Sequence, residues 1–309
     1  MPKFSVIISV YNKEAFIKKT LQSVFAQTLQ NYEVVVVNDA STDRSEEMIQ
    51  SMGNEIIYHA FTDNKGAAAT RNKAIQLATG EYIALLDGDD LWHPYYLEEI
   101  NNLMREFPTH DIFATAIDIE DHDGKRTSSY TFPNPKNKQH LEVDYFEGSY
   151  KNTVLTSSST VIKKNVFDTI GYYDESIKSG QDTDLWIRIG LQYPIAFSTK
   201  PCATYTYAPI SLYKSIGSVK HRPNFVKFEE IEKRNKTLKK FLDLNRFSLV
   251  IRAKLWNEPK EAQFFTERID SSNLNKKQLK LLHAPAFIIK LLFRIKRILE
   301  KLGIRLGVY

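Results

Sequence analysis

The chain has 309 residues, of which 42% are hydrophobic and 26% are charged. These values exclude disordered, collagen-like and low-complexity proteins, and the length predicts about two structural units. The net charge of +5 lies in residues 284–309, which hold six basic residues and one acidic residue. Because the remainder is neutral overall, we expect no basic face for nucleic acid.

The compartment is predicted from what the sequence lacks. Its single cysteine, Cys202, cannot form an intramolecular disulfide, and no Cys or His pair has zinc-ligand spacing. The apolar run 4–11 is too short for a signal-peptide core, and no run approaches the ~18 apolar residues of a transmembrane helix. We therefore expect a cytoplasmic protein that is soluble or lies on a membrane without crossing it.

Strands and helices alternate through the first 86 residues. The predicted strands are apolar runs rich in β-branched residues, at 4–10, 33–37, 55–59 and 81–86, and the predicted helices cover 14–27, 43–52 and 66–78. This alternation predicts an α/β fold with a mostly parallel sheet and helices on both faces.

Beyond residue 86 the pattern is less regular. It predicts a helix at 94–106, a strand at 111–119, a turn at 121–124, a loop at 133–138, a helix at 182–192 and a strand at 195–207. From residue 224 onward the pattern is helical. We therefore expect one α/β domain at 1–222 and a helical C-terminal extension at 223–309.

Two predicted strands end in carboxylates, where open parallel sheets bind ligands. Asp39 follows the second strand, and the segment 87–90 (DGDD) follows the fourth. No glycine-rich phosphate loop is present, so a bound diphosphate needs another source of positive charge. Three neighbouring aspartates favour a hard cation such as Mg²⁺ or Mn²⁺. The alternative is an Asp-rich turn in which Asp89 or Asp90 caps the next helix.

Four segments resemble, in order and spacing, the family 2 glycosyltransferases of the GT-A fold. They are 6–12 (VIISVYN), 35–43 (VVVNDASTD), 64–72 (NKGAAATRN) and 82–90 (YIALLDGDD), and the resemblance covers residues 4–207. It implies a nucleotide-sugar-binding half at 1–115 and an acceptor-side half at 116–222. It also implies an inverting hexosyl- or N-acetylhexosaminyl-transferase, using a UDP-sugar and a glycan or lipid-linked saccharide, in cell-surface polysaccharide synthesis.

The resemblance implies a donor site at the first two strand ends. The acid at the position of Asp39 accepts a hydrogen bond from N3–H of uracil, which cytosine lacks; the alternative is an Asx turn with Ser41 or a helix cap. Ser9 and Tyr11 fall at the base-binding edge, or are ordinary strand-end residues. Arg71 is expected to contact the nucleotide, or else to form a surface salt bridge.

The resemblance also implies a Mn²⁺ or Mg²⁺ site in the segment 87–90. Asp89 would bind the metal directly, and Asp87 would face the ribose and a metal-bound water. Gly88 belongs to the donor site, and Asp90 supports the metal ligands or caps a helix. His221 is a candidate third ligand or phosphate contact, or a solvated loop histidine.

The segment 180–188 (GQDTDLWIR) resembles the Glu-Asp segment in which the family carries its general base. This implies Asp182 as the base, with Gln181 in place of the usual Glu; the alternative is an acid that interacts with the helix dipole. Asp184 and Arg188 have the spacing of an ion pair on one helix face.

The C-terminal tail, 284–309, is predicted to bind an anionic membrane at the inner face of the cell membrane. Between residues 288 and 302 apolar side chains recur with helical periodicity, opposite a basic face. The alternative is a helix packed on the protein or on a second subunit, which leaves a homodimer open.

Two other functions compete with glycosyl transfer. A sugar nucleotidyltransferase would need an N-terminal glycine-rich nucleotide loop, which this sequence lacks. A non-catalytic membrane-associated nucleotide-sugar-binding protein is indicated only by Gln181. A measurement of catalytic turnover would distinguish this non-catalytic binding protein from an enzyme.

Overall fold

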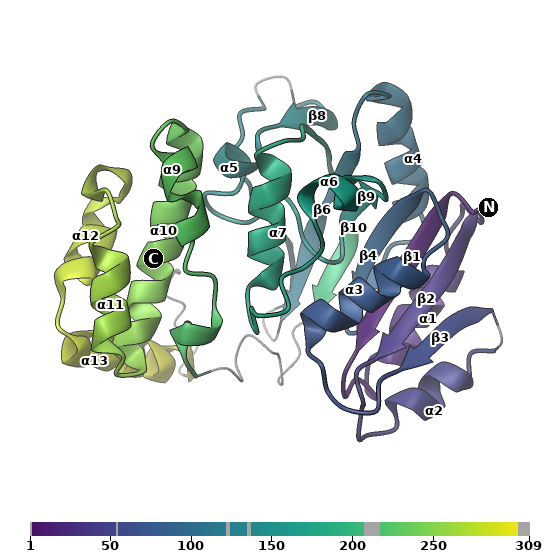
Figure 1. The fold of residues 1–309 in the computed structure, drawn as a ribbon, viewed down its shortest axis with the longest axis horizontal. Coiled ribbons are helices and arrows are strands. Elements are labelled where there is room, and N and C mark those ends of the chain that lie inside the picture. Colours follow the sequence, from purple (N-terminus) through teal and green to yellow (C-terminus); the bar gives the residue numbers. More distant parts are fainter. Residues whose placement is uncertain (1, 54, 122–123, 135–136, 207–216, 302–309) are drawn as a thin grey trace. The chain divides into compact units, whose positions relative to one another are not determined.

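The computed structural model describes residues 2–301 apart from 54, 122–123, 135–136 and 207–216. The chain forms two compact units, residues 1–211 and 212–309 (Figure 1). The first unit contains the sheet, and the second is built from helices. Parts of the predicted turn at 121–124, loop at 133–138 and tail at 284–309 lie outside the described residues.

Ten strands of the described chain form one sheet in the order β3-β2-β1-β4-β9-β6-β10-β5, with β7 beside β6 and β8 beside β10. The strands are β1 Phe4–Val10, β2 Tyr32–Asn38, β3 Ile56–Ala60, β4 Tyr82–Asp87, β5 Leu91–Trp92, β6 Ile112–Asp121, β7 Gly124–Thr127, β8 His140–Val143, β9 Thr160–Lys163 and β10 Ile195–Thr206. The helices of this unit are α1 Ile17–Phe25, α2 Ser45–Gln50, α3 Ala67–Leu77, α4 Tyr96–Glu106, α5 Tyr145–Gly148, α6 Val166–Ile170 and α7 Gln181–Gly190.

The first four strands are parallel, as the sequence predicts. β1 lies between β2 and β4, and β3 flanks β2. The register pairs Ser9 with Asp87 and Val10 with Asn38. The carboxyl ends of β1, β2 and β4 therefore meet at one edge of the sheet, where the predicted site residues lie.

The second half of the sheet is mixed. β9 lies between β4 and β6 and is antiparallel to both, whereas β10 runs parallel to β6. Sequence analysis missed β5, β7, β8, β9, α5 and α6, because segments of two to five residues are too short to show a hydrophobic period. The fold is α/β with a mixed sheet flanked by helices, parallel from β3 through β4 and between β6 and β10.

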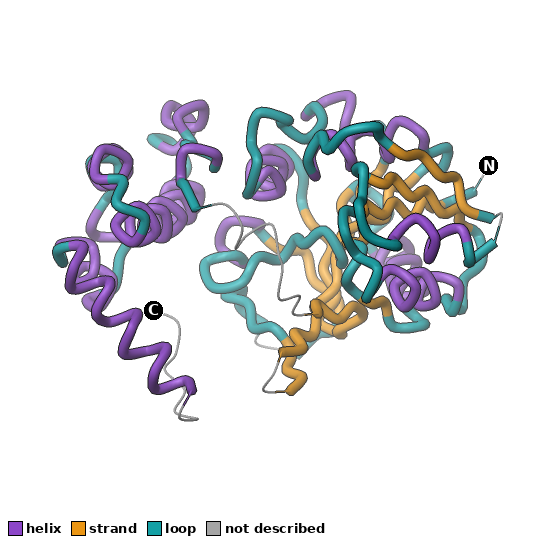
Figure 2. Tube along the Cα trace, turned by 90° about the horizontal axis from the view of Figure 1, so that it is seen from below, coloured by secondary structure: helices purple, strands orange, loops and turns teal. Residues whose placement is uncertain are grey.

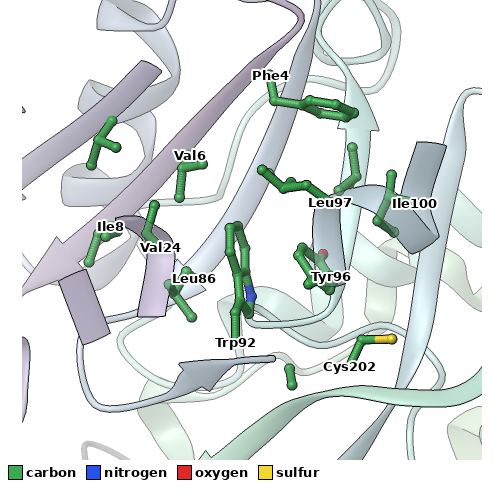
Figure 3. Packing of buried hydrophobic residues seen from close by; sticks show 14 of the residues in the cluster. Phe4, Val6, Ile8, Val24, Leu86, Trp92, Tyr96, Leu97, Ile100 and Cys202 are labelled. Atoms are coloured by element: carbon green, nitrogen blue, oxygen red, sulfur yellow. The ribbon is translucent and has the colours of Figure 1, made fainter. Parts of the chain in front are cut away.

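The main core lies on the face of the sheet covered by α1 and α4. Val6 and Ile8 of β1 pack there with side chains of both helices, and Trp92 and Tyr96 lie side by side in the same cluster (Figure 3). Their rings stack with centroids 4.2 Å apart. Cys202 is buried in this cluster, and burial raises the pKa of its thiol to about 12. α3 packs against β1 and β2 on the opposite face, because alternate strand residues point there.

The second unit consists of α9 Glu229–Glu232, α10 Lys236–Leu255, α11 Pro259–Thr266, α12 Lys276–His283 and α13 Ala286–Lys301, with short 3₁₀ turns (Figure 2). Arg246 is fully buried in it and forms ion pairs with Glu232 at 2.8 Å and Asp243 at 3.2 Å. In the described part of the chain, no helix is both long enough and apolar enough to span a bilayer.

Candidate active site

The loops after β1 and β2 brace each other. The backbone N–H of Asn12 donates to Ser41 Oγ at 2.9 Å, and that of Lys13 donates to Ser45 Oγ at 2.7 Å. In return, Asn12 Oδ1 accepts from the N–H of Thr42 at 2.8 Å. These hydrogen bonds hold the two strand ends in one arrangement without a glycine-rich turn.

Ser9 and Tyr11 lie at the end of β1. Ser9 is half-buried, and Tyr11 is 46% exposed just beyond the strand. Gly88 packs closely behind them, since a Cβ added to it would lie 3.1 Å from the carbonyl oxygen of Ser9. The exposed ring of Tyr11 is accessible to a planar ligand at this edge.

Asp39 is buried and anchors the loop that precedes α3. Its side chain accepts from the backbone N–H of Lys65 at 2.7 Å and from that of Gly66 at 2.9 Å. The N–H of Ser41 donates instead to Asn38 Oδ1 at 3.1 Å. The Asx-turn alternative for Asp39 is therefore wrong. A carboxylate has about four acceptor positions, so two loop hydrogen bonds leave capacity for a ligand.

Arg71 forms a largely buried ion pair with Asp87. Arg71 Nη2 donates to Asp87 Oδ1 at 2.6 Å, and its guanidinium lies 5.5 Å from the ring centroid of Tyr173. Its Nη1 is buried and has no hydrogen-bond partner among the described residues. Burial by itself would lower the pKa of Arg71, but Asp87, with smaller contributions from Tyr173 and Asp182, raises it. Arg71 therefore forms a salt bridge, which was the alternative to nucleotide contact, but this pair is largely buried rather than on the surface.

Lys13 pairs with Asp89, a contact that sequence analysis missed. Lys13 Nζ lies 2.5 Å from Asp89 Oδ2, and both side chains are mostly buried. Burial raises the pKa of Asp89, Asp87 adds to the effect, and Lys13 opposes it. The position of Lys13 shortly after the first strand indicated a basic residue near the site, but the sequence did not show which acid it pairs with.

Asp90 is buried and links distant segments. Its side chain accepts from Ser158 Oγ at 2.6 Å and from the backbone N–H of Thr206 at 2.9 Å. Burial raises its pKa well above the ordinary value, and Asp87 and Asp89 contribute. α4 begins at Tyr96 and has no side-chain cap bond. The helix-cap alternative for Asp89 and Asp90 is therefore wrong.

The carboxylates of Asp87 and Asp89 fit a divalent cation. Both provide hard oxygen ligands, and in this structure Asp87 pairs with Arg71 and Asp89 with Lys13. Among the described residues, no group of three or more His, Cys, Asp or Glu side chains could hold a metal. A Mg²⁺ site typically uses one or two carboxylates and takes further ligands from water and substrate phosphates, so a metal held by Asp87 and Asp89 stays a prediction. His221 is exposed and lies in the second unit, and its role as a third ligand or phosphate contact stays a prediction.

Asp182 lies in the first turn of α7, after Gly180, whose φ is 83°. It is half-buried, and its Oδ1 accepts from the N–H of Thr183 at 2.8 Å. Its charge contributes to the raised pKa of Arg71, so it belongs to the same electrostatic environment. Gln181 is buried, and its Oε1 has no hydrogen-bond partner. The position of Asp182 suits both a base and a dipole-stabilising acid.

The ion pair predicted on α7 is confirmed. Arg188 Nε donates to Asp184 Oδ2 at 3.0 Å, and its guanidinium also donates to the carbonyl oxygens of Gly171 at 3.0 Å and Tyr172 at 2.8 Å. Asp184 therefore orients an arginine that holds the chain after α6, while Asp182 has a half-exposed carboxylate.

Comparisons with known proteins show which sequences this chain is similar to. The family model "Glycosyl transferase family 2" matches residues 5–171. An uncharacterized glycosyltransferase of Rickettsia typhi is 32% identical over 191 residues, which are 60% of this chain and 58% of that protein. YwdF, an uncharacterized glycosyltransferase of Bacillus subtilis, is 28% identical over 67% of this chain and 74% of its own length.

A solved structure shares the fold. S. aureus TarS 1–349 in complex with UDP-GlcNAc aligns with a TM-score of 0.60 and 22% identity, covering 86% of this chain and 71% of that one. The predicted GT-A fold is thereby confirmed.

Proposed function

The chain belongs to glycosyltransferase family 2, and we propose that it transfers a sugar from a UDP-sugar to a glycan or lipid-linked saccharide, with inversion at the anomeric carbon. One observation carries the proposal, namely the set of charged side chains at the carboxyl edge of the parallel strands. The set consists of the buried Asp39, the ion pairs Lys13–Asp89 and Arg71–Asp87, and Asp182 at the start of α7. A hexosyl- or N-acetylhexosaminyl-transferase in cell-surface polysaccharide synthesis is the proposed role.

The uracil base is proposed to lie beside Asp39. The buried carboxylate accepts N3–H of uracil, and cytosine is rejected because its N3 is itself an acceptor. The loop hydrogen bonds from Lys65 and Gly66 keep the carboxylate in place before the donor arrives. Ser9 and Tyr11 line the same edge.

The diphosphate is proposed to lie between the ion pairs Lys13–Asp89 and Arg71–Asp87. A divalent cation held by Asp89, and by Asp87 through water, would supply positive charge to the departing UDP. Arg71 has a free buried N–H to donate to a phosphate oxygen, and Lys13 brings a second positive charge within reach. These two side chains replace the missing phosphate loop.

Asp182 is proposed to accept the proton of the acceptor hydroxyl. As the hydroxyl oxygen attacks the anomeric carbon, a new C–O bond forms, the bond to the UDP oxygen breaks, and the proton moves to the Asp182 carboxylate. Arg71 stays charged because of its acidic neighbours, so it does not compete for this proton.

The test is turnover of a UDP-sugar panel with Mn²⁺, measured as UDP release with and without saccharide acceptors. Asp182→Asn should lower kcat by roughly 10²- to 10⁴-fold and leave UDP affinity within about two-fold, because the donor is held by other residues. Asp168→Asn, an exposed first-turn acid of α6, is the matched control and should retain full activity.

An Asp182→Asn enzyme with more than about half the original transfer rate would contradict this assignment of the base. UDP-sugar binding without turnover under any acceptor would instead favour the non-catalytic nucleotide-sugar-binding protein, for which the neutral Gln181 is the only support.

A further inference from the structure

Helix α13 exposes an apolar face. Its sixteen residues include large side chains that are exposed although they are hydrophobic, with Phe287 at 70% and Ile298 at 58% exposure. The exposed set is Phe287, Ile288, Leu291, Leu292, Ile295 and Ile298. A contiguous patch of this kind on a folded protein marks an interaction surface.

The opposite edge of α13 attaches it to the second unit. Ile289 is only 1% exposed, and Lys290 Nζ donates to Asn257 Oδ1 at 2.6 Å. α13 also packs against α10, and it can be followed in Figure 2 as the long helix that leads toward the C label. The alternative of a helix packed on the protein therefore holds for one edge of α13, whereas its apolar face is exposed to solvent.

Basic residues border the apolar face. At 100° per residue, Lys290 and Arg294 fall between the packed edge and the apolar face, and Arg294 is exposed. The tail holds the whole net charge of the chain. A helix of this length extends about 24 Å, enough to lie flat in the headgroup region. This charge complementarity favours an anionic lipid surface over an apolar protein partner.

We propose that α13 lies in the interface of an anionic membrane, with the six apolar side chains inserted among the acyl chains and the basic border at the lipid phosphates. This partner is independent of the sugar donor, because the residues concerned belong to the helical unit. The enzyme would then act at the inner face of the cell membrane, where lipid-linked acceptors lie.

The test is sedimentation of the full chain with phosphatidylcholine vesicles that contain or lack 30% phosphatidylglycerol, in 50 and 500 mM salt. The protein should pellet with the anionic vesicles at low salt and be largely released at high salt. Leu291→Ser with Ile295→Ser should reduce vesicle affinity about ten-fold or more. Ile231→Ser, which removes an equally exposed apolar side chain from α9, should have no effect.

UDP affinity, measured on every variant, reports that the first unit is folded and separates this proposal from the donor-site proposal. Equal pelleting of the double variant and the wild type would overturn the membrane role. The membrane role would also be overturned if the wild type binds no vesicles, forms a dimer by light scattering, and loses this dimer in the double variant. The apolar face of α13 would then join two copies of the chain.

Discussion

Replacing Asp39 by Asn tests the double role of a buried carboxylate. Asp39 is 3% exposed and accepts two backbone hydrogen bonds, at 2.7 Å from Lys65 and 2.9 Å from Gly66. An amide of the same shape offers one oxygen and one NH₂ group. One of the two loop N–H groups would therefore face a donor and lose its partner.

The cost follows from these two hydrogen bonds. A hydrogen bond to a charged group contributes about 1.5–3 kcal/mol, and an unpaired buried N–H costs a similar amount. We expect Asp39→Asn to lower the unfolding free energy of the first unit by about 2–3 kcal/mol. For a unit of 211 residues this corresponds to a Tm decrease of roughly 5–10 °C. UDP affinity should fall as well, and discrimination against CDP should be lost.

The assay combines calorimetric melting without ligand and titration with UDP and CDP. Asp63→Asn is the matched control, because Asp63 lies in the same loop, is 62% exposed and forms a surface ion pair with Lys65. Such pairs contribute about 0–1 kcal/mol, so this variant should melt close to the wild type. An Asp39→Asn protein that melts like the wild type would refute the anchoring role, and unchanged preference for UDP over CDP would refute the base-reading role.

Two further variants probe charge at both ends of the sheet. Lys13→Met should raise the affinity for Mn²⁺ in the absence of nucleotide about ten-fold at pH 8, because the ammonium group 2.5 Å from Asp89 Oδ2 no longer competes with the metal. Electron paramagnetic resonance measures this affinity. Weaker Mn²⁺ binding by the variant would contradict Asp89 as a direct ligand. Burial by itself would raise the pKa of Glu33, but hydrogen bonds from Ser5 and Thr79 outweigh burial and lower that pKa. The ionised Glu33 carboxylate therefore stabilises the folded protein above pH 4.5, and this stabilisation is lost on acidification. Melting of Glu33→Gln should therefore differ most from wild type near pH 7, and the two should converge as the pH falls through the lowered pKa of Glu33.

The sequence by itself determined the parallel half of the fold and the location of the site. Continuous β-branched runs separated by helices leave few alternatives to right-handed crossovers. These crossovers bring the ends of β1, β2 and β4 to one edge. Asp39 and the segment 87–90 are therefore brought together by the sequence pattern alone.

Only the tertiary structure decided the partners of charged groups that pair across long stretches of sequence. Lys13 and Asp89 are 76 positions apart, and Asp90 meets Ser158 and Thr206 from segments further along the chain. Local periodicity carries no information about such pairs. The contact between Asp90 and Ser158 depends on β9 entering the sheet antiparallel between β4 and β6, and the four residues of β9 are too few to show a period. The exposed face of α13 was likewise decided by packing, because an amphipathic pattern does not show which edge of a helix a neighbour will cover.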